Sequence, residues 1–149
     1  MSGAELMRKV VAGFAKSDLR PLLDAMHDEI VWKTANSHEG LFRFDGHYKG
    51  RAAVMDVLAR LSLDYTFRRF VEKEVLAKGD VVWGLFDVSM SFDPKGQGQV
   101  AKDIELEMAI RWRIRDGKII EHQAFFDTAS LLIQQGTMAP PTPQSQVKL

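Results

Sequence analysis

Apolar positions in the first part of the chain recur with the spacing of amphipathic helices. One face of the first segment collects apolar side chains at intervals of three and four residues, namely Leu6, Met7, Val10, Val11 and Phe14. After a stop at Ser17-Asp18 a second helix is predicted over residues 19–26, where Pro21 is tolerated because the first turn needs no N–H donor. A third helix is predicted after Gly50, with a buried stripe formed by Val54, Val57, Leu58 and Leu61.

Alternation of apolar and polar positions dominates most of the remaining chain. It predicts strands, rich in β-branched and aromatic residues, over 29–34, 67–77, 81–92, 104–115 and 119–126. Residues 36–49 are predicted to form a loop that includes a short strand at 41–44, and a short helix capped by Asp127 is predicted over 128–136. Helices followed by antiparallel strands indicate an α+β domain, in which the helices cover one face of a curved sheet.

The strand over 104–115 has two chemically different sides. Its even positions are apolar, whereas its odd positions carry glutamates, arginines and one alanine. Asp116-Gly117 is a typical two-residue hairpin turn, and regular pairing beyond it places Arg111 opposite His122, so that both share a face. A bulge at the turn would shift this pairing by one residue. Pattern alone sends the apolar side to the core and the charged side to water.

The amino-acid composition argues against several classes of function and site. The chain carries 20 basic and 20 acidic side chains, so no net charge favours nucleic acid or a membrane surface. It contains no cysteine, which excludes disulfides, thiolate metal sites and cysteine nucleophiles. The loop histidines His38 and His47 match no metal-site spacing. We therefore expect neither a metal nor a cofactor.

The length of 149 residues fits one domain. We predict this domain over residues 1–136 and a flexible, proline-rich tail over 137–149. The longest apolar runs are shorter than the ~20 residues that cross a bilayer. The first residues lack the core of a signal peptide, so we expect a cytoplasmic protein.

Two ionisable residues interrupt apolar strands and are the candidates for chemistry. Asp87 lies in the middle of 81–92, and His122 lies within 119–126. Burial of a carboxylate is costly unless it is paired or protonated, and proteins tolerate that cost where chemistry needs the charge. If both residues face one cavity, they are expected to act as an acid–base pair. The structural alternatives are a carboxylate tied to Arg111 or to a backbone N–H, and a histidine satisfied within the core.

Further residues are candidates for ligand binding. Arg111 is either the counter-charge of the pair or an anchor for a carboxylate or enolate oxygen of a substrate. Trp32, Trp83 and Phe126 would be core residues in any fold, but they also suit the lining of an apolar pocket. Thr34 shares the face of Trp32 on the strand 29–34 and is included with them.

The order of the elements and three local patterns resemble the SnoaL-like group of the nuclear-transport-factor-2-like superfamily. The matching stretches are DEIVWKT at 28–34, GHYKGRAAV at 46–54 and DGKIIEHQAFFDTASLLIQQG at 116–136, within a similarity over about residues 4–136. The resemblance implies a cone-shaped, curved antiparallel sheet wrapped around a deep pocket that the N-terminal helices close. It also implies a homodimer through the outer face of the sheet. That arrangement would turn the side with Arg111 and His122 inward, and give the apolar side of 104–115 to a partner.

The catalytic residues of known members are mostly replaced in this chain. Where the resemblance to ketosteroid isomerase places an aspartate base, a tyrosine and a protonated aspartic acid, this chain has Thr34, Val10 and Ala109. Relative to limonene epoxide hydrolase, one aspartate is kept as Asp87 and another is replaced by Ala124.

Together these features predict a cofactor-independent isomerase, cyclase or hydrolase that performs acid–base chemistry on a small hydrophobic molecule in an enclosed pocket. The alternative is a ligand-binding or dimerisation module that has lost the family's catalytic residues. The missing carboxylates favour the alternative, whereas a cavity shared by Asp87 and His122 would favour the enzyme.

Overall fold

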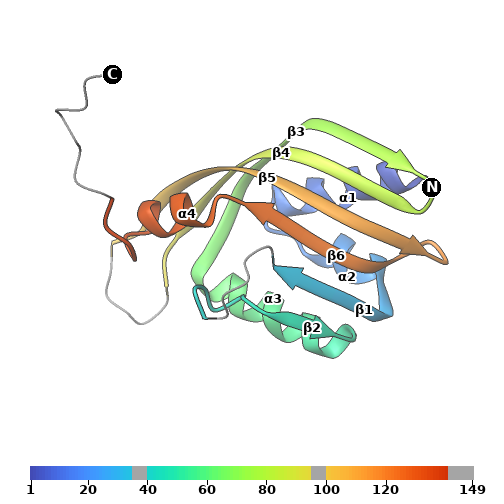
Figure 1. Ribbon diagram of the computed structural model, residues 1–149, viewed down its shortest axis with the longest axis horizontal. Helices are drawn as coiled ribbons and strands as arrows, with labels where there is room; N and C mark the ends of the chain where they lie inside the picture. Colours follow the sequence, from blue (N-terminus) through green and yellow to red (C-terminus); the bar gives the residue numbers. More distant parts are fainter. Residues whose placement is uncertain (35–39, 95–99, 141–149) are drawn as a thin grey trace, which may run out of the picture.

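The computed structural model describes residues 1–34, 40–94 and 100–140, and its main feature is a curved six-stranded sheet (Figure 1). The helices are α1 (Gly3–Phe14), α2 (Arg20–Ala25), α3 (Arg51–Asp64) and α4 (Thr128–Gln134). The strands are β1 (Met26–Thr34), β2 (His47–Lys49), β3 (Tyr65–Lys78), β4 (Val81–Phe92), β5 (Lys102–Arg115) and β6 (Lys118–Phe126). They lie in the order β2-β1-β6-β5-β4-β3, and only β1 and β6 pair in parallel. The predicted α+β class with a curved, mostly antiparallel sheet is confirmed.

The N-terminal helices cover one face of this sheet, which we call the inner face. α1 begins with a capping box, in which the Ser2 side chain accepts a hydrogen bond from the Glu5 N–H and the Glu5 carboxylate accepts one from the Ser2 N–H. The apolar stripe of α1 packs on β3 and β4, and its Met7 and Val10 are fully buried. In Figure 1, α1 and α2 lie behind the strands. The spacing of apolar residues in the sequence therefore identified the buried helix face correctly.

The close approach of α1 to β4 depends on Gly84. A Cβ atom at this position would lie 2.5 Å from the Phe86 ring and 2.7 Å from the Met7 sulfur, and both side chains are fully buried. We expect Gly84→Ala to lower the free energy of unfolding by about 1–3 kcal/mol, because the core must shift to admit the methyl group. Urea unfolding measures this cost. The added cost should shrink in a Met7→Ala background, and an equal cost in both backgrounds would show that Met7 is not the obstacle.

The pairing of β5 with β6 contains one extra residue close to the hairpin turn, and this residue shifts the register of the two strands. Asp116 and Gly117 have φ angles of 53° and 72°, and Arg115 pairs with Lys118, so the predicted two-residue turn is confirmed. The register then shifts between Arg113 and Ile114, because Ile114 pairs with Ile119 whereas Arg113 pairs with Glu121. The extra residue forms a bulge that buries two successive isoleucines, Ile119 and Ile120.

This bulge overturns the predicted pairing of Arg111 with His122. Trp112 lies opposite His122, and Arg111 lies opposite Gln123. The apolar side of β5 therefore faces the core with His122, and the side with Arg111 forms the outer face of the sheet. The arrangement expected from the family resemblance, with Arg111 inward and the apolar side on a partner, is wrong. Burial of the apolar side chains, led by Ile104, Ile110 and Trp112, decides which side faces inward.

α4 covers the part of β5 that extends past its last pair with β6, Met108–Phe126. The Gln134 side-chain amide accepts a hydrogen bond from the Glu105 N–H at 2.8 Å and donates one to the Glu105 carbonyl oxygen at 2.9 Å. These are the two bonds that a neighbouring strand would form, so one side chain completes the edge. As predicted, Asp127 caps the helix, by accepting a hydrogen bond from the Ser130 N–H.

The remaining expectations on organisation have mixed outcomes. The short strand expected at 41–44 is wrong, because the short strand of this region is β2 and residues 41–44 form turns and bends. Within the described ranges, no helix is long and apolar enough to cross a membrane. The division into a domain over 1–136 and a tail over 137–149 stays a prediction, and residues 141–149 lie outside the described part.

Candidate functional site

A cavity of about 80 Å³ lies between the inner face of the sheet and the helices. Its described lining comes from α1, α3, α4, five of the strands and the turn segment before β2. It includes six large apolar side chains, those of Phe14, Phe44, Phe67, Phe70, Met108 and Ile110. The polar residues of the described lining are Lys33, Thr34, Tyr65 and His122. Lys33 is exposed to solvent, so the buried polar chemistry of the cavity belongs to the other three.

His122 is held between two tryptophans. Its ring stacks on Trp32 of the neighbouring strand β1, with ring centroids 3.5 Å apart and planes inclined by 12°. The Trp112 indole Nε1–H donates a hydrogen bond to His122 Nδ1 at 2.9 Å. Only 5% of His122 is exposed. The stacking on Trp32 therefore determines the plane of the imidazole, and the hydrogen bond from Trp112 determines which ring nitrogen faces Trp112.

These contacts also determine the protonation state of His122. An indole N–H can only donate, so Nδ1 must be unprotonated and the proton of the neutral ring resides on Nε2. Burial lowers the pKa of His122 to about 3. No described residue forms a hydrogen bond to Nε2. His122 thus brings an unpartnered N–H donor, and no charge, to the apolar cavity.

The other two buried polar groups already have partners. Thr34 Oγ1 accepts a hydrogen bond from the Gly46 N–H at 3.2 Å, and the Tyr65 hydroxyl donates to the Gln135 side-chain oxygen. Burial raises the pKa of Tyr65 well above its ordinary value. Both hydroxyls stay protonated at neutral pH, so neither can act there as a base.

Asp87 lies on the outer face, on the opposite side of the sheet from His122. Its side chain is 58% exposed, and its carboxylate lies 3.7 Å from the Lys73 ammonium group. Phe86 and Val88, its neighbours on β4, point inward and are buried, so the alternation of the strand directs Asp87 outward. The predicted acid–base pair of Asp87 and His122 is therefore wrong: the two residues share no cavity.

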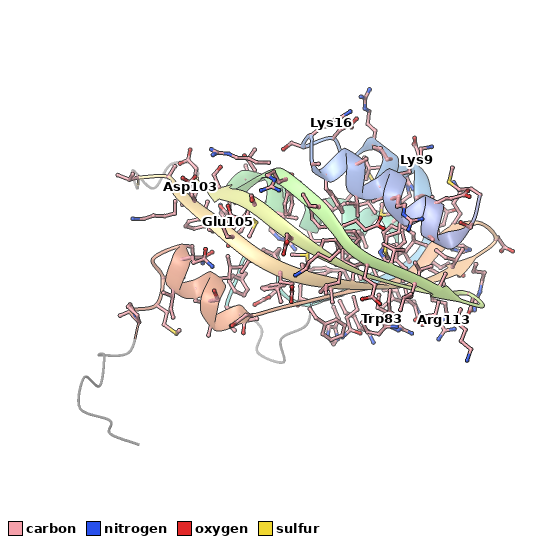
Figure 2. All side chains as sticks on the ribbon, turned by 90° about the horizontal axis from the view of Figure 1, so that it is seen from above. Lys9, Lys16, Trp83, Asp103, Glu105 and Arg113 are labelled. Carbon is pink, nitrogen blue, oxygen red and sulfur yellow. The ribbon has the colours of Figure 1, made fainter. Side chains whose placement is uncertain are left out.

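Arg111 and Trp83 lie on the outer face too. The Arg111 guanidinium pairs with the Glu121 carboxylate at 3.1 Å. Trp83 is 43% exposed and stacks on Phe125, with ring centroids 5.9 Å apart. Figure 2 shows Trp83 on the side of the sheet that faces away from α1. Their prediction as pocket residues is wrong, because each occupies an outward position of its strand.

The other predicted residues do line the cavity. Trp32, Thr34, His122 and Phe126 all contribute to its wall, although their role in ligand binding stays a prediction. Sequence reasoning missed Trp112 as the partner of His122 and Tyr65 as part of the wall. Trp112 lies on the apolar side of residues 104–115, which the sequence pattern identifies. The pattern did not show the bulge beyond the turn, which brings Trp112 rather than Arg111 opposite His122. Tyr65 opens β3, just before the predicted strand.

The described lining contains no aspartate or glutamate. In the same part of the chain, no group of three or more histidine and carboxylate side chains is arranged to hold a metal ion. The described cavity can therefore enclose an apolar body and donate one hydrogen bond, but it supplies no carboxylate for proton transfer.

Comparison with known proteins points to one family. The model of the SnoaL-like domain matches residues 7–122. No curated protein sequence matches the chain. Solved structures with a similar fold include a candidate isomerase from Rhodopseudomonas palustris, with a TM-score of 0.71 and 20% identity over 89% of this chain and 94% of that one.

Two other solved structures share the fold. A candidate polyketide cyclase from Pseudomonas putida KT2440 has a TM-score of 0.72 and 18% identity, over 91% of this chain and 98% of that one. TerC, crystallised with polyporic acid, has a TM-score of 0.69 and 22% identity, over 89% of this chain and 96% of that one. At these identities the similarity establishes the fold.

Proposed function

The chain belongs to the SnoaL-like domain family, and we propose that it binds a small, uncharged and largely apolar molecule that accepts one hydrogen bond from His122. The single observation that carries this proposal is the buried His122 Nε2–H, which has no partner among the described residues and belongs to the wall of the cavity.

The apolar wall selects the body of the ligand. Phenylalanine, methionine and isoleucine side chains surround the cavity, and removal of apolar ligand surface from water is favourable by about 25 cal/mol per Å². A charged ligand would lose its hydration, and no buried side chain of the described lining carries an opposite charge. These features support a neutral ligand.

The His122 donor selects one functional group on that ligand. A buried N–H without a partner costs about 1–3 kcal/mol, which a ligand oxygen can recover. Carbonyl, ether and hydroxyl oxygens all accept such a bond. A likeness in fold to TerC, which was crystallised with polyporic acid, supports a small organic molecule as the ligand.

The proposal can be tested with two ligands of the same shape. Acetophenone carries a carbonyl oxygen where α-methylstyrene carries a methylene group. We expect the protein to bind acetophenone about ten-fold more tightly, a difference of about 1.4 kcal/mol, because only the ketone satisfies the His122 N–H. Changes in tryptophan fluorescence or in protein NMR spectra measure both affinities. The preference should not change between pH 5 and pH 8, because the pKa of His122 is about 3.

Two variants test whether the His122 N–H causes the preference for acetophenone over α-methylstyrene. His122→Phe keeps a ring against Trp32 but removes the donor, so both ligands should bind with similar affinity. Trp83→Phe, on the outer face, should leave the preference unchanged. Equal affinities of the wild-type protein for the two ligands would refute the role of His122.

A second candidate function is catalysis on a carbonyl compound, as an isomerase or a cyclase. A neutral imidazole N–H can stabilise the negative charge that develops on a carbonyl oxygen when an α-proton leaves. With no carboxylate in the described lining, water would have to accept that proton. Exchange of the acetophenone methyl protons with deuterated solvent, followed by NMR, distinguishes the two functions. Exchange above the buffer rate that is lost in His122→Phe indicates catalysis, and no exchange indicates binding alone.

A further inference from the structure

A second hollow lies beside the ligand cavity, at the end of the sheet where α4 lies. It has a volume of about 170 Å³, and its described lining combines apolar and polar side chains. Figure 1 shows the start of β3, the end of β4 and α4 together at this end of the sheet. We call this space the outer hollow, and the cavity that contains His122 the inner cavity. Tyr65 belongs to the lining of both.

Two further segments divide their side chains between these spaces. In the turn segment before β2, Arg43 lines the outer hollow and its neighbour Phe44 lines the inner cavity. In the C-terminal helix region, Leu131 lines the inner cavity and Gln135, the C-cap of α4, lines the outer hollow. The two spaces therefore follow one another, and Tyr65 belongs to the partition between them.

Ring packing and one hydrogen bond hold Tyr65 in this partition. Its ring centroid lies 5.6 Å from that of Phe44 and 5.1 Å from that of Phe92. Its hydroxyl donates a hydrogen bond to the side-chain oxygen of Gln135, and both residues are buried. This bond connects the first residue of β3 with the end of α4. A single hydrogen bond of this kind is weak enough for thermal motion to break, because water can replace the partner.

We propose that the outer hollow is an entrance to the inner cavity, and that Tyr65 is its gate, kept closed by the hydrogen bond to Gln135. When this bond breaks, rotation of the Tyr65 side chain joins the two spaces and lets a small molecule pass. Loss of the bond therefore increases the fraction of time during which the gate is open. The gate does not depend on the identity of the ligand, whereas its use in ligand entry rests on the function proposed above.

The charges around the outer hollow favour the passage of an uncharged molecule. Asp64 is buried, and its carboxylate pairs with the guanidinium group of Arg43, so the two charges compensate each other. No other side chain of the described lining is charged at neutral pH. An anion would have to compete with Asp64 for Arg43, and a cation would have to compete with Arg43 for Asp64. The entrance and the inner cavity therefore favour the same chemical class of ligand.

Quenching of tryptophan fluorescence by acrylamide tests the gate without any ligand. Acrylamide is small and neutral, and Trp32 lies in the wall of the inner cavity. In a Trp83→Phe background the emission comes from the buried Trp32 and Trp112 alone. We expect Tyr65→Phe and Gln135→Met each to raise the quenching constant about five-fold, because each removes the hydrogen bond of the gate. The double variant Y65F/Q135M should show no further increase, because both changes remove the same bond.

Gln134→Met is the matched control, because it makes the same change one position earlier in the chain. Gln134 binds the backbone of Glu105 and belongs to neither described lining, so its loss should leave the quenching constant unchanged. Thr137→Phe, added to Gln135→Met, places a ring in the outer hollow and should lower the quenching constant again. The gate is overturned if Tyr65→Phe and Gln135→Met have no effect, or if Gln134→Met has an equal one. The outer hollow is overturned as the route if Thr137→Phe does not lower the constant.

The exchange of acetophenone, followed by NMR line shapes, tests whether the gate serves the ligand. Gln135 lies outside the described lining of the inner cavity, so Gln135→Met should raise the association and dissociation rate constants by the same factor, about five-fold. The dissociation constant should then stay unchanged. A change in the dissociation rate constant alone would overturn the role of Gln135 in ligand entry. If acetophenone does not bind, the function proposed above fails, whereas the acrylamide experiment still decides whether the gate exists.

Discussion

The free energy of unfolding is expected to fall by about 2 kcal/mol between pH 7 and pH 5 because of His122 alone. In the folded protein the pKa of this buried histidine is about 3, whereas its ordinary value is 6.5. Between these two values only the unfolded chain binds the proton. Each pH unit below the ordinary value therefore favours unfolding by about 1.4 kcal/mol. The contribution of His122 to stability is fully present above pH 6.5 and is lost as the pH falls.

Urea unfolding at several pH values measures this loss, and His122→Gln is the comparison. Glutamine cannot take up the proton, but its amide oxygen can still accept the Trp112 N–H. Carboxylates that titrate in both proteins cancel when the two pH profiles are subtracted. The wild-type protein should lose about 2 kcal/mol more than the variant between pH 7 and pH 5. Parallel profiles would show that His122 is protonated in the folded state.

Trp112→Phe should lower the free energy of unfolding by about 2–5 kcal/mol. Trp112 is fully buried, so the smaller ring leaves a void in the core. The change also removes the only described hydrogen bond to His122 Nδ1, which leaves a buried acceptor unsatisfied. Urea unfolding at neutral pH measures the sum of both costs.

Trp83→Phe is the matched control, because it makes the same chemical change on the outer face. Its cost should be about 0.5 kcal/mol or less. The double variant W112F/H122F separates the two causes. It removes donor and acceptor together, so its cost should be smaller than the sum of the single costs. Strict additivity would mean that the hydrogen bond between Trp112 and His122 contributes nothing.

Local patterns predicted the elements of the fold well, because helices and strands each bury one side at a fixed period. The stripe at Met7 and Val10 and the turn at Asp116-Gly117 needed no knowledge of distant residues. The side of β5 that faces the core also followed from alternation alone. Only the family resemblance argued for the reverse, and it was wrong on this point.

The candidate site was harder to predict, because it depends on register and on faces that look alike in sequence. Ile119 and Ile120 are both apolar, so no pattern showed that a bulge would bury both and bring His122 to Trp112. Asp87 looked buried because Trp83 and Leu85, which share its face, are apolar as well.

α4 contributes to the cavity wall but lies outside the strand pairing, so its length can change independently of the sheet. Leu131 of this helix belongs to the cavity wall, while Gln134 fastens the helix to the edge of β5. The part of the cavity wall that α4 supplies is therefore a separate piece near the C-terminus of the described chain, outside the pairing of the strands. Insertions or deletions within it would change the length of molecule that fits, without altering a single strand register. Chimeras that exchange only this segment between relatives should exchange their preference for ligand size.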